Sequence, residues 1–417
     1  TAGADDAFVD AFDITSLKET LRQAQGQFTL WVKKPAEVRT TRDLLNSLGS
    51  DFFKLLDELT IARARRHVQK YYQQEMERLG GFPARTQPVA RFANIDLSNR
   101  FMSYDKLSEE IEGYTLSLFN PSRFVLPRYQ EEYARRVGNF TQAQREGFLI
   151  GMMKVNFLKR LESSVHAFAL TMQRTIDKIE ALEHRLHVFQ AAQENADIDL
   201  EVADLADIED EELRESLQVG KKLTFRTAHL DVERWLTALQ QDKQQLYGLH
   251  LQARDVCPAR DAKLAELKAL IQAKVTQPTH DKDGAPNRKV LIFTAFADTA
   301  TYLYAHLQRW VQQELGIHIA LVVGSGENHT TFTPTGYSHA NHFNHILINF
   351  SPRSKQRARI AAMPQTGEID LLIATDCISE GQNLQDCDYL INYEIHWNPV
   401  RIIQRFGRID RIGSRNE

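Results

Sequence analysis

The sequence predicts an α/β fold with a parallel sheet at the C-terminal end, preceded by a large and mostly α-helical region. From residue 286 on, short apolar runs alternate with helical patterns, an order typical of parallel strands that helices cover on both faces. Before about residue 280, apolar side chains recur at steps of three and four, the spacing of amphipathic helices. We expect three parts: a helical segment at 1–80, a linker with a helical protrusion or insertion at 81–285, and an α/β lobe at 286–417.

The first part should be built from helices. One is expected over residues 13–25, with Asp13 or the pair Thr15-Ser16 as its N-terminal cap. A second helical pattern covers residues 43–80, with apolar positions at Leu44, Leu45, Leu48, Phe52, Phe53, Leu55, Leu56 and Leu59. Gly80-Gly-Phe-Pro83 should end it, and residues 87–97 are expected to form an extended linker or a strand.

The second part has one dominant pattern, a long amphipathic helix over residues 158–189. Its apolar stripe consists of Leu158, Leu161, Val165, Phe168, Met172, Ile176, Ile179, Leu182, Leu186 and Phe189. Packing within the chain is favoured, and a coiled coil with another chain is the alternative. Residues 194–215 carry 11 acidic side chains, which predicts an exposed connector or a solvated short helix, with a mimic of nucleic acid as the alternative.

The third part should contain four strands and two flanking helices. The strands are expected at 289–293, 317–323, 369–375 and 389–393, and the helices near 298–314 and 353–362. Ligands bind such sheets at the carboxyl ends of the strands. Asp376, Gly381 and Asn383 follow one predicted strand and Trp397-Asn-Pro399 follows another. We therefore expect a binding site at this edge.

Two polar stretches of the third part allow more than one interpretation. His339, His342 and His345 have a spacing that could bind zinc, but no cysteine or rigid frame accompanies them, so an exposed insertion without a metal is favoured. The run Ser351-Pro-Arg-Ser-Lys-Gln-Arg357 places three cations near an expected helix N-terminus. It could contact phosphates or merely cap a surface helix.

Composition and charge argue against several classes of protein, among them membrane-spanning and disulfide-rich secreted proteins. The chain has 417 residues, of which 42% are hydrophobic and 25% charged, and a net charge of −4, so any nucleic-acid site must be a local patch. The three cysteines form no CxxC pair, which favours a reducing cytoplasm over a disulfide framework. No apolar run approaches the length of a membrane span, and the first residues do not resemble a signal peptide. A cytoplasmic protein is expected.

Four short segments near the end of the chain contain the residues that are suited to binding or catalysis. They are residues 370–376, Gly381-Gln-Asn-Leu384, residues 397–399 and residues 404–413, the last with arginines at 405, 408 and 411. Guanidinium groups at the edge of an α/β sheet suit the charge that builds on a transferring phosphoryl group. A basic helix end that is merely solvated is the alternative. No GxxxxGK[ST] phosphate loop and no acidic metal-holding box occur anywhere in the sequence.

At these residues the chain resembles the second RecA-like lobe of superfamily-two helicases and translocases, specifically the Swi/Snf-type ATPases. Motif V is matched by Thr375-Asp376, Gly381 and Asn383-Leu384, and the Trp-Asn-Pro element by 397–399. Motif VI is matched by Gln404, Gly407, Arg408, Arg411, Ile412 and Gly413. Ile378, Ser379 and Glu380 differ from the eukaryotic remodellers and resemble the bacterial branch, which includes the RNA-polymerase-recycling ATPases.

The resemblance implies that two lobes contribute different residues to ATP hydrolysis. ATP would bind in the cleft between them, and a first lobe outside this chain would supply the phosphate loop and hold Mg²⁺. Arg408 and Arg411 would stabilise the transition state, while Gln404, Asp376, Gly381 and Asn383 would contact the nucleotide. The chain is thus expected to be the C-terminal part of the ATPase, inactive on its own. Ile61–Arg66 resembles the arginine-containing segment that follows the first lobe, and a solvated charged helix face is the alternative.

The resemblance also implies a nucleic-acid partner, with double-stranded DNA favoured. Residues assigned to that contact are Thr294, Phe296, Thr375 and Arg353, the first two in the place of motif IV. Such relatives translocate on duplex DNA without separating its strands. Two other classes stay open. The protein could be a helicase-like regulatory or binding module without turnover, or the motor subunit of a defence or restriction system.

Overall fold

The computed structural model describes residues 16–35, 38–59, 65–133, 136–137, 140–192, 200–201, 224–324, 326–378, 381–396 and 398–416. The chain divides into two compact units, Thr1–Leu79 and Gly80–Glu417. No helix among the described residues combines the length and the hydrophobicity that crossing a bilayer requires.

The first unit is helical. Its described elements are α2 (Leu17–Val32), α3 (Thr41–Ser47), α4 (Ser50–Leu59), α5 (Arg65–Tyr71) and α6 (Gln73–Arg78). The Ser16 side chain caps α2 by accepting a hydrogen bond from the Glu19 backbone nitrogen at 3.4 Å, so the helix begins at a predicted cap but extends beyond residue 25. The pattern at 43–80 is divided into short helices, because Leu48 adopts an extended conformation and ends α3. Residues 13–15 and most of Ile61–Arg66 lie outside the described residues.

Helices also dominate the first part of the second unit. The long ones are α7 (Tyr104–Glu112), α9 (Gln142–Ser163), α10 (Val165–Ala192) and α12 (Val232–Asp255). Shorter elements join them: 3₁₀ turns at Ser117–Phe119, Pro121–Phe124, Pro127–Tyr129 and Thr227–His229, helix α8 (Gln130–Tyr133), and the strand pairs β1–β2 (Arg136–Val137, Phe140–Thr141) and β3–β4 (Leu200–Glu201, Thr224–Phe225). We call residues 98–257 the helical block. Residues 87–95 take up no regular element.

The predicted apolar stripe is confirmed, but it spans two helices rather than one. The break lies at Ser164, whose Oγ accepts a hydrogen bond from the Ala167 backbone nitrogen at 3.0 Å and so caps α10. Buried stripe residues of α10 pack with buried residues of α12, among them Trp235, Leu239 and Leu246. The stripe is therefore covered within this chain. Of the acidic stretch 194–215, only Leu200 and Glu201 are described.

The last part of the chain forms the predicted parallel sheet. Its strands are β7 (Val290–Phe293), β8 (Ile319–Val322), β9 (His329–Thr330), β10 (Leu371–Ala374) and β11 (Leu390–Asn392), in the order β11-β7-β10-β8-β9. The first four strands in this order run parallel, with Leu371 of β10 opposite Val290 of β7, and β9 is an antiparallel edge. A short hairpin, β5 (Thr279–His280) with β6 (Pro286–Asn287), precedes the sheet.

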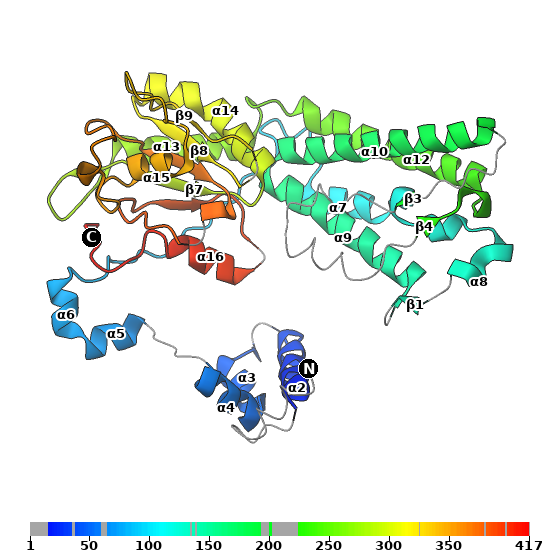
Figure 1. The fold of residues 1–417 in the computed structure, drawn as a ribbon, viewed down its shortest axis with the longest axis horizontal. Helices are drawn as coiled ribbons and strands as arrows, with labels where there is room; N and C mark the ends of the chain where they lie inside the picture. The colour runs from blue at the N-terminus through cyan, green and yellow to red at the C-terminus, as the bar shows by residue number, and fades with distance from the viewer. Residues whose placement is uncertain are drawn as a thin grey trace. The chain divides into compact units, whose positions relative to one another are not determined.

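Helices cover both faces of this sheet, as the continuous apolar strands predict (Figure 1). Val290 and Ile292 of β7 face a core that includes buried residues of α13 (Ala262–Thr276) and α14 (Ala297–Glu314). Leu291 and Phe293 face the opposite core, which is formed with α15 (Phe343–Phe350) and with Leu384. Helix α13 thus lies before residue 286 in sequence but shares the core of the sheet.

The helix predicted near residues 353–362 is wrong. The helix lies earlier, at α15, inside the stretch that was expected to be an exposed polar insertion, and its residues Ile346, Leu347 and Phe350 are buried. Residues 352–359 form turns instead, with Gln356 in the left-handed region at φ 53°. Pro352 directly after α15 disfavours its continuation, since proline offers no backbone N–H.

The histidines of this stretch lie close together. The ring centroids of His339 and His342 are 4.7 Å apart, and those of His342 and His345 are 5.5 Å apart. No group of three or more side chains suited to holding a metal occurs among the described residues. That the insertion binds no zinc stays a prediction, which elemental analysis of the dialysed protein would test.

Candidate functional site

The candidate site lies where β10 and β11 end and α16 (Pro399–Phe406) begins. Asp376 opens a 3₁₀ turn, Asp376–Ile378, just after β10. Asn398 starts α16: its Oδ1 accepts a hydrogen bond from the Val400 backbone nitrogen at 3.0 Å, and Pro399 occupies the first helical position. Helix α16 and the residues that follow it carry the three regularly spaced arginines. Trp397 lies outside the described residues.

The first of these arginines, Arg405, is a buried structural residue. Its Nε and Nη2 donate to the two carboxylate oxygens of Asp376 at 2.7 and 2.8 Å, and its Nη1 donates to Asn392 Oδ1 at 3.1 Å. Its guanidinium carbon lies 5.3 Å from the ring centre of Phe293. Arg405 therefore ties α16 to residues of β7 and β11 and to the turn after β10.

The next two arginines reach a different residue. Arg408 Nη1 and Arg411 Nη2 donate to the backbone carbonyl oxygen of Gln382, at 3.2 and 3.0 Å. Their Nε groups donate to the carbonyl oxygens of Gln404 and Gly407, each four residues earlier, at 3.1 and 3.2 Å. Both side chains are half-buried. Two guanidinium groups are thus held side by side through carbonyl oxygens.

The loop that contains Gln382 is fixed to the end of α16. The Leu384 backbone nitrogen donates to the Arg408 carbonyl oxygen at 3.0 Å, and Leu384 is fully buried. Asn383 Oδ1 accepts a hydrogen bond from the Gln385 nitrogen at 3.3 Å, so it turns back on its own loop. Gly381 is exposed and has φ 73°, a backbone conformation that favours glycine. The loop and the arginines form one assembly.

One lysine of the basic run at 351–357, for which the sequence left phosphate contact and a surface cap open, reaches the same loop. Lys355 Nζ donates to Gln382 Oε1 at 2.8 Å. Partial burial, together with the charge of Arg411, lowers the pKa of Lys355 from its usual value. We call Lys355, Arg408 and Arg411 the cation cluster. The run of basic residues at 351–357 was noticed in the sequence, but its spacing could not tell which cation faces this loop.

The other two cations of that run are engaged elsewhere. Arg353 Nη1 forms an ion pair with Asp281 Oδ2 at 2.6 Å. The buried Arg357 donates from Nη1 to Asn349 Oδ1 at 3.1 Å and to the Gly367 carbonyl oxygen at 2.8 Å. The assignment of Arg353 to nucleic acid stays a prediction.

The remaining predicted site residues are mostly buried. Thr294 and Phe296 are 0% and 4% exposed, and the Arg160 guanidinium from the helical block lies 4.3 Å from the ring centre of Phe296. Thr375, which is 8% exposed, accepts a hydrogen bond at Oγ1 from the Gly324 nitrogen at 3.3 Å. Gln404 is half-buried on α16. Their roles in nucleotide or nucleic-acid binding stay predictions.

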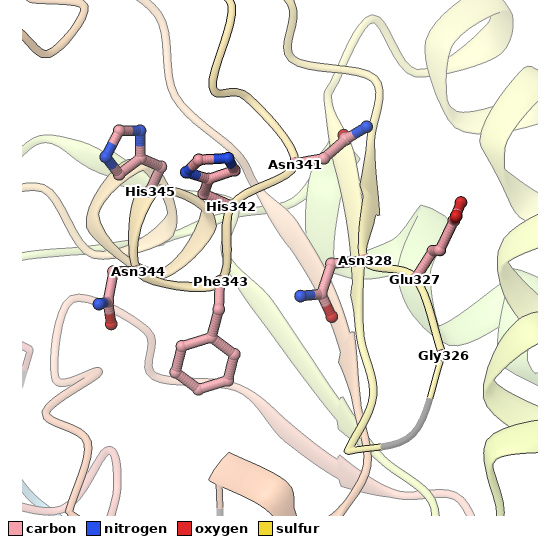
Figure 2. A pocket seen from close by; sticks show the side chains of 8 residues that line it. All are labelled: Gly326, Glu327, Asn328, Asn341, His342, Phe343, Asn344 and His345. Carbon is pink, nitrogen blue, oxygen red and sulfur yellow. The ribbon is translucent and has the colours of Figure 1, made fainter.

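A pocket of about 680 Å³ has a lining that includes none of the predicted site residues (Figure 2). Its lining comes from the turn between β8 and β9 and from the start of α15: Gly326, Glu327, Asn328, Asn341, His342, Phe343, Asn344 and His345. None of the arginines and none of the loop residues at 381–385 lines it. The cation cluster therefore does not contribute to the lining of this pocket.

Comparisons with known proteins identify the α/β part. Residues 263–413 match the family described as Helicase conserved C-terminal domain. A Bacillus subtilis (strain 168) protein named Uncharacterized ATP-dependent helicase YqhH is 51% identical over 51 residues, which are 12% of this chain and 9% of that protein. Dicer-like protein 1 of Neurospora crassa is 28% identical over 162 residues, which are 38% of this chain and 9% of that protein. The matched segments therefore span about a tenth of these relatives.

Two solved structures are remotely similar. The C-terminal part of the Fun30 ATPase domain shares 14% identity at a TM-score of 0.29, covering 81% of this chain and 84% of that one. The Pyrococcus furiosus Hef helicase domain shares 15% identity at a TM-score of 0.34, covering 75% and 50%. Residues 263–413, which match the helicase C-terminal family, include all five strands of the sheet, among them its antiparallel edge strand β9.

Proposed function

We propose that this chain is the C-terminal part of a nucleic-acid-dependent ATPase of the Swi/Snf type, from the bacterial branch, which translocates on double-stranded DNA. The helicase domain over residues 263–413 and the partial match to a protein named as an ATP-dependent helicase support the ATPase assignment. The observation that carries the proposal is the convergence of Arg408 and Arg411 on the Gln382 carbonyl oxygen, at 3.2 and 3.0 Å.

The two arginines are suited to act as arginine fingers. A carbonyl oxygen is a neutral partner, so a negatively charged phosphate oxygen can replace it at a gain in electrostatic energy. Charge develops on the phosphoryl oxygens in the transition state, and planar guanidinium groups that face it lower the barrier. Arg405 would keep both in place, because its bonds to Asp376 fix α16 relative to the sheet.

The nucleotide requires residues from outside this chain. Bound ATP would supply the phosphoryl group that is transferred. We assign the phosphate loop and the Mg²⁺ to a first ATPase lobe, since this sequence contains no GxxxxGK[ST]. On the present lobe, Arg408 and Arg411 would contact the phosphates, with Gln404, Asp376, Gly381 and Asn383 nearby as further contacts or supports.

The nucleic-acid groove is proposed at the carboxyl ends of β7 and β10, close to Thr294, Phe296 and Thr375. Arg353 would add a phosphate contact by exchanging its partner Asp281 for the backbone of the nucleic acid. The turn after β10 carries Asp376, which binds Arg405, so a movement at the groove would reach α16 through this ion pair. Closure of the two lobes on ATP would drive the stepping.

The test uses a protein in which this chain follows a first ATPase lobe. Replacing Arg408 or Arg411 by alanine should lower DNA-stimulated ATP hydrolysis by roughly 10³–10⁵-fold, the loss typical of a missing arginine finger. DNA affinity and thermal stability should stay nearly unchanged. Arg408→Lys should restore little activity, because an ammonium group lacks the planar fork.

The matched control is Arg359→Ala, which removes an exposed arginine whose Nη1 donates to the Gln356 side chain. It should leave hydrolysis unchanged. Near-normal turnover in both Arg408→Ala and Arg411→Ala, or loss of activity only through unfolding, would show that the arginines are not fingers.

A further inference from the structure

The carboxylate of Glu394 contacts two other elements at the edge of the sheet where the parallel strands end. Glu394 lies two residues after β11 and is 7% exposed. Its Oε1 accepts a hydrogen bond from the backbone nitrogen of Ala295, which lies two residues after the neighbouring strand β7. Its Oε2 accepts a hydrogen bond from the hydroxyl group of Ser163, the last residue of α9, at 3.3 Å. One side chain therefore joins the ends of two strands to the helical block.

Ser163 belongs to a buried row of hydroxyl groups. Its Oγ lies 2.7 Å from Thr299 Oγ1, and Ser164 Oγ lies 3.0 Å from the same Thr299 atom. Ser164 caps α10, and Thr299 lies in the first turn of α14. A carboxylate only accepts hydrogen bonds, so Ser163 donates to Glu394, Thr299 donates to Ser163 and Ser164 donates to Thr299. The break between α9 and α10 thus supplies Glu394 with an oriented donor.

A cation lies close to this carboxylate. Lys263 Nζ donates to the Ser163 carbonyl oxygen at 3.1 Å and lies 4.2 Å from the ring centre of Tyr393, the residue before Glu394. Burial lowers the pKa of Lys263, and the charge of Glu394 opposes that shift. The two opposite charges therefore offset part of the free energy that burying each of them costs.

Both strand ends at Glu394 lead to parts of the proposed mechanism. Ala295 is the middle residue of the segment 294–296, which the proposed function places near the nucleic acid; we call this segment the β7 loop. Four residues after Glu394, the chain reaches Asn398, whose side chain caps α16. The two proposed arginine fingers follow that helix. A displacement of the β7 loop would therefore change a hydrogen bond of the residue from which the chain leaves β11 for α16.

We propose that Glu394 is a positioning residue that couples the β7 loop to α16, and that the helical block braces it through Ser163. The inference rests on the proposed function and states how nucleic acid in the groove would regulate the arginines. It adds a second connection to α16 beside the ion pair of Arg405 with Asp376. A carboxylate is suited to this role because each of its two oxygens accepts a strong hydrogen bond from a different element.

The coupling is tested in a protein in which this chain follows a first ATPase lobe. ATP hydrolysis is measured with and without a DNA duplex, and the ratio of the two rates reports the coupling. Glu394→Ala should lower this ratio by roughly 2–30-fold, the change that single residues typically produce in the coupling between two sites. Glu394→Gln should lower it less, since the amide oxygen can still accept from Ala295. Ser163→Ala should also lower it less, because the bond to Ala295 remains.

Asp242→Ala is the matched control. Asp242 is 2% exposed and, like Glu394, accepts a hydrogen bond from a backbone nitrogen, that of Ser117, but both residues lie within the helical block. Its loss should lower the unfolding midpoint and leave the ratio unchanged. An unchanged ratio in Glu394→Ala, or an equal fall in Asp242→Ala, would show that Glu394 serves stability alone.

Hydrogen exchange in the chain itself gives a readout that needs no first lobe. In folded Glu394→Ala, the amides of the β7 loop and of α16 should exchange faster than in the original chain, while those of β8 should not. In Asp242→Ala, exchange in α16 should not change. Unchanged exchange of α16 in Glu394→Ala would overturn the inference. If DNA does not stimulate hydrolysis by the original two-lobed protein, the proposed function is wrong instead, and the exchange data still decide whether Glu394 holds α16.

Discussion

Two cation-rich regions of the second unit differ in what their cations contact. In the first, where the helical block meets α14, Arg160 Nη1 lies 2.9 Å and Arg174 Nη1 2.7 Å from Asp298 Oδ2. The Arg160 side chain is 1% exposed. In the cation cluster, the side chains are half-buried and bond to carbonyl and amide oxygens of one loop. We call the first region the junction.

The difference indicates two roles for the same residue types. A buried guanidinium paired with a carboxylate is satisfied within the fold, and removing either partner leaves an uncompensated charge. A half-buried cation that bonds to a carbonyl or amide oxygen can exchange that neutral partner for a ligand anion, so we expect such cations to serve binding. Substitutions at the junction should therefore act on stability, and substitutions in the cation cluster should act on binding and turnover.

The largest effect on stability should come from Asp298→Ala at the junction. It would leave Arg160 buried without the carboxylate that it now contacts, a change that typically costs about 3–5 kcal/mol of folding free energy. Chemical unfolding followed by circular dichroism measures this. Asp283→Ala is a control, because it removes an exposed carboxylate that pairs with the exposed Arg415. Equal, small losses in both variants would remove the distinction between the two regions.

A smaller effect should appear in the pH dependence of that stability. Burial acts to raise the pKa of Asp298, but the hydrogen bond and charge of Arg174 and the charge of Arg160 outweigh it and hold the pKa below its usual 3.8. A carboxyl group with a lowered pKa stabilises the fold above its unfolded-state pKa, and this contribution is lost as the pH falls through the lowered value.

Unfolding of the original chain and of Asp298→Asn should be compared at neutral pH and below about pH 4. The gap in stability between them should be largest at neutral pH and should shrink in acid, because the amide cannot titrate. A gap of constant size would mean that the ionisation of Asp298 does not contribute to the difference, which would contradict a lowered pKa in the folded chain.

The lobe was largely predictable from sequence, whereas the contacts within the site were not. The strands of the parallel sheet lie where short apolar runs predicted them, and α14 spans Ala297–Glu314 against an expected 298–314, because a continuous apolar run between turn residues has few alternatives. The helix after residue 353 was wrong because the start of the basic run there is held by a partner that is distant in sequence, Asp386. The spacing of residue types along a short segment does not reveal such contacts.

The contacts within the candidate site could not be predicted from sequence for the same reason. The spacing of Arg405, Arg408 and Arg411 predicted that arginines would gather at the sheet edge, but it did not separate the structural one from the other two. That separation depends on Asp376 and Asn392, which are distant in sequence from α16. Gln382 was noticed only as part of a motif, since nothing in its neighbours reveals that Lys355 would reach it.

The most direct measurement of this distinction compares Arg405→Ala with Arg411→Ala in the same chain by thermal unfolding. Arg405 is fully buried and bonded to the Asp376 carboxylate, so its removal should lower the unfolding midpoint clearly, as expected for a broken buried pair worth about 3–5 kcal/mol. Arg411 bonds to carbonyl oxygens, so its removal should leave the midpoint nearly unchanged. If Arg411→Ala destabilises the chain as much as Arg405→Ala does, or if Arg405→Ala has no effect, the assignment of one arginine to the fold and the other to the ligand is contradicted.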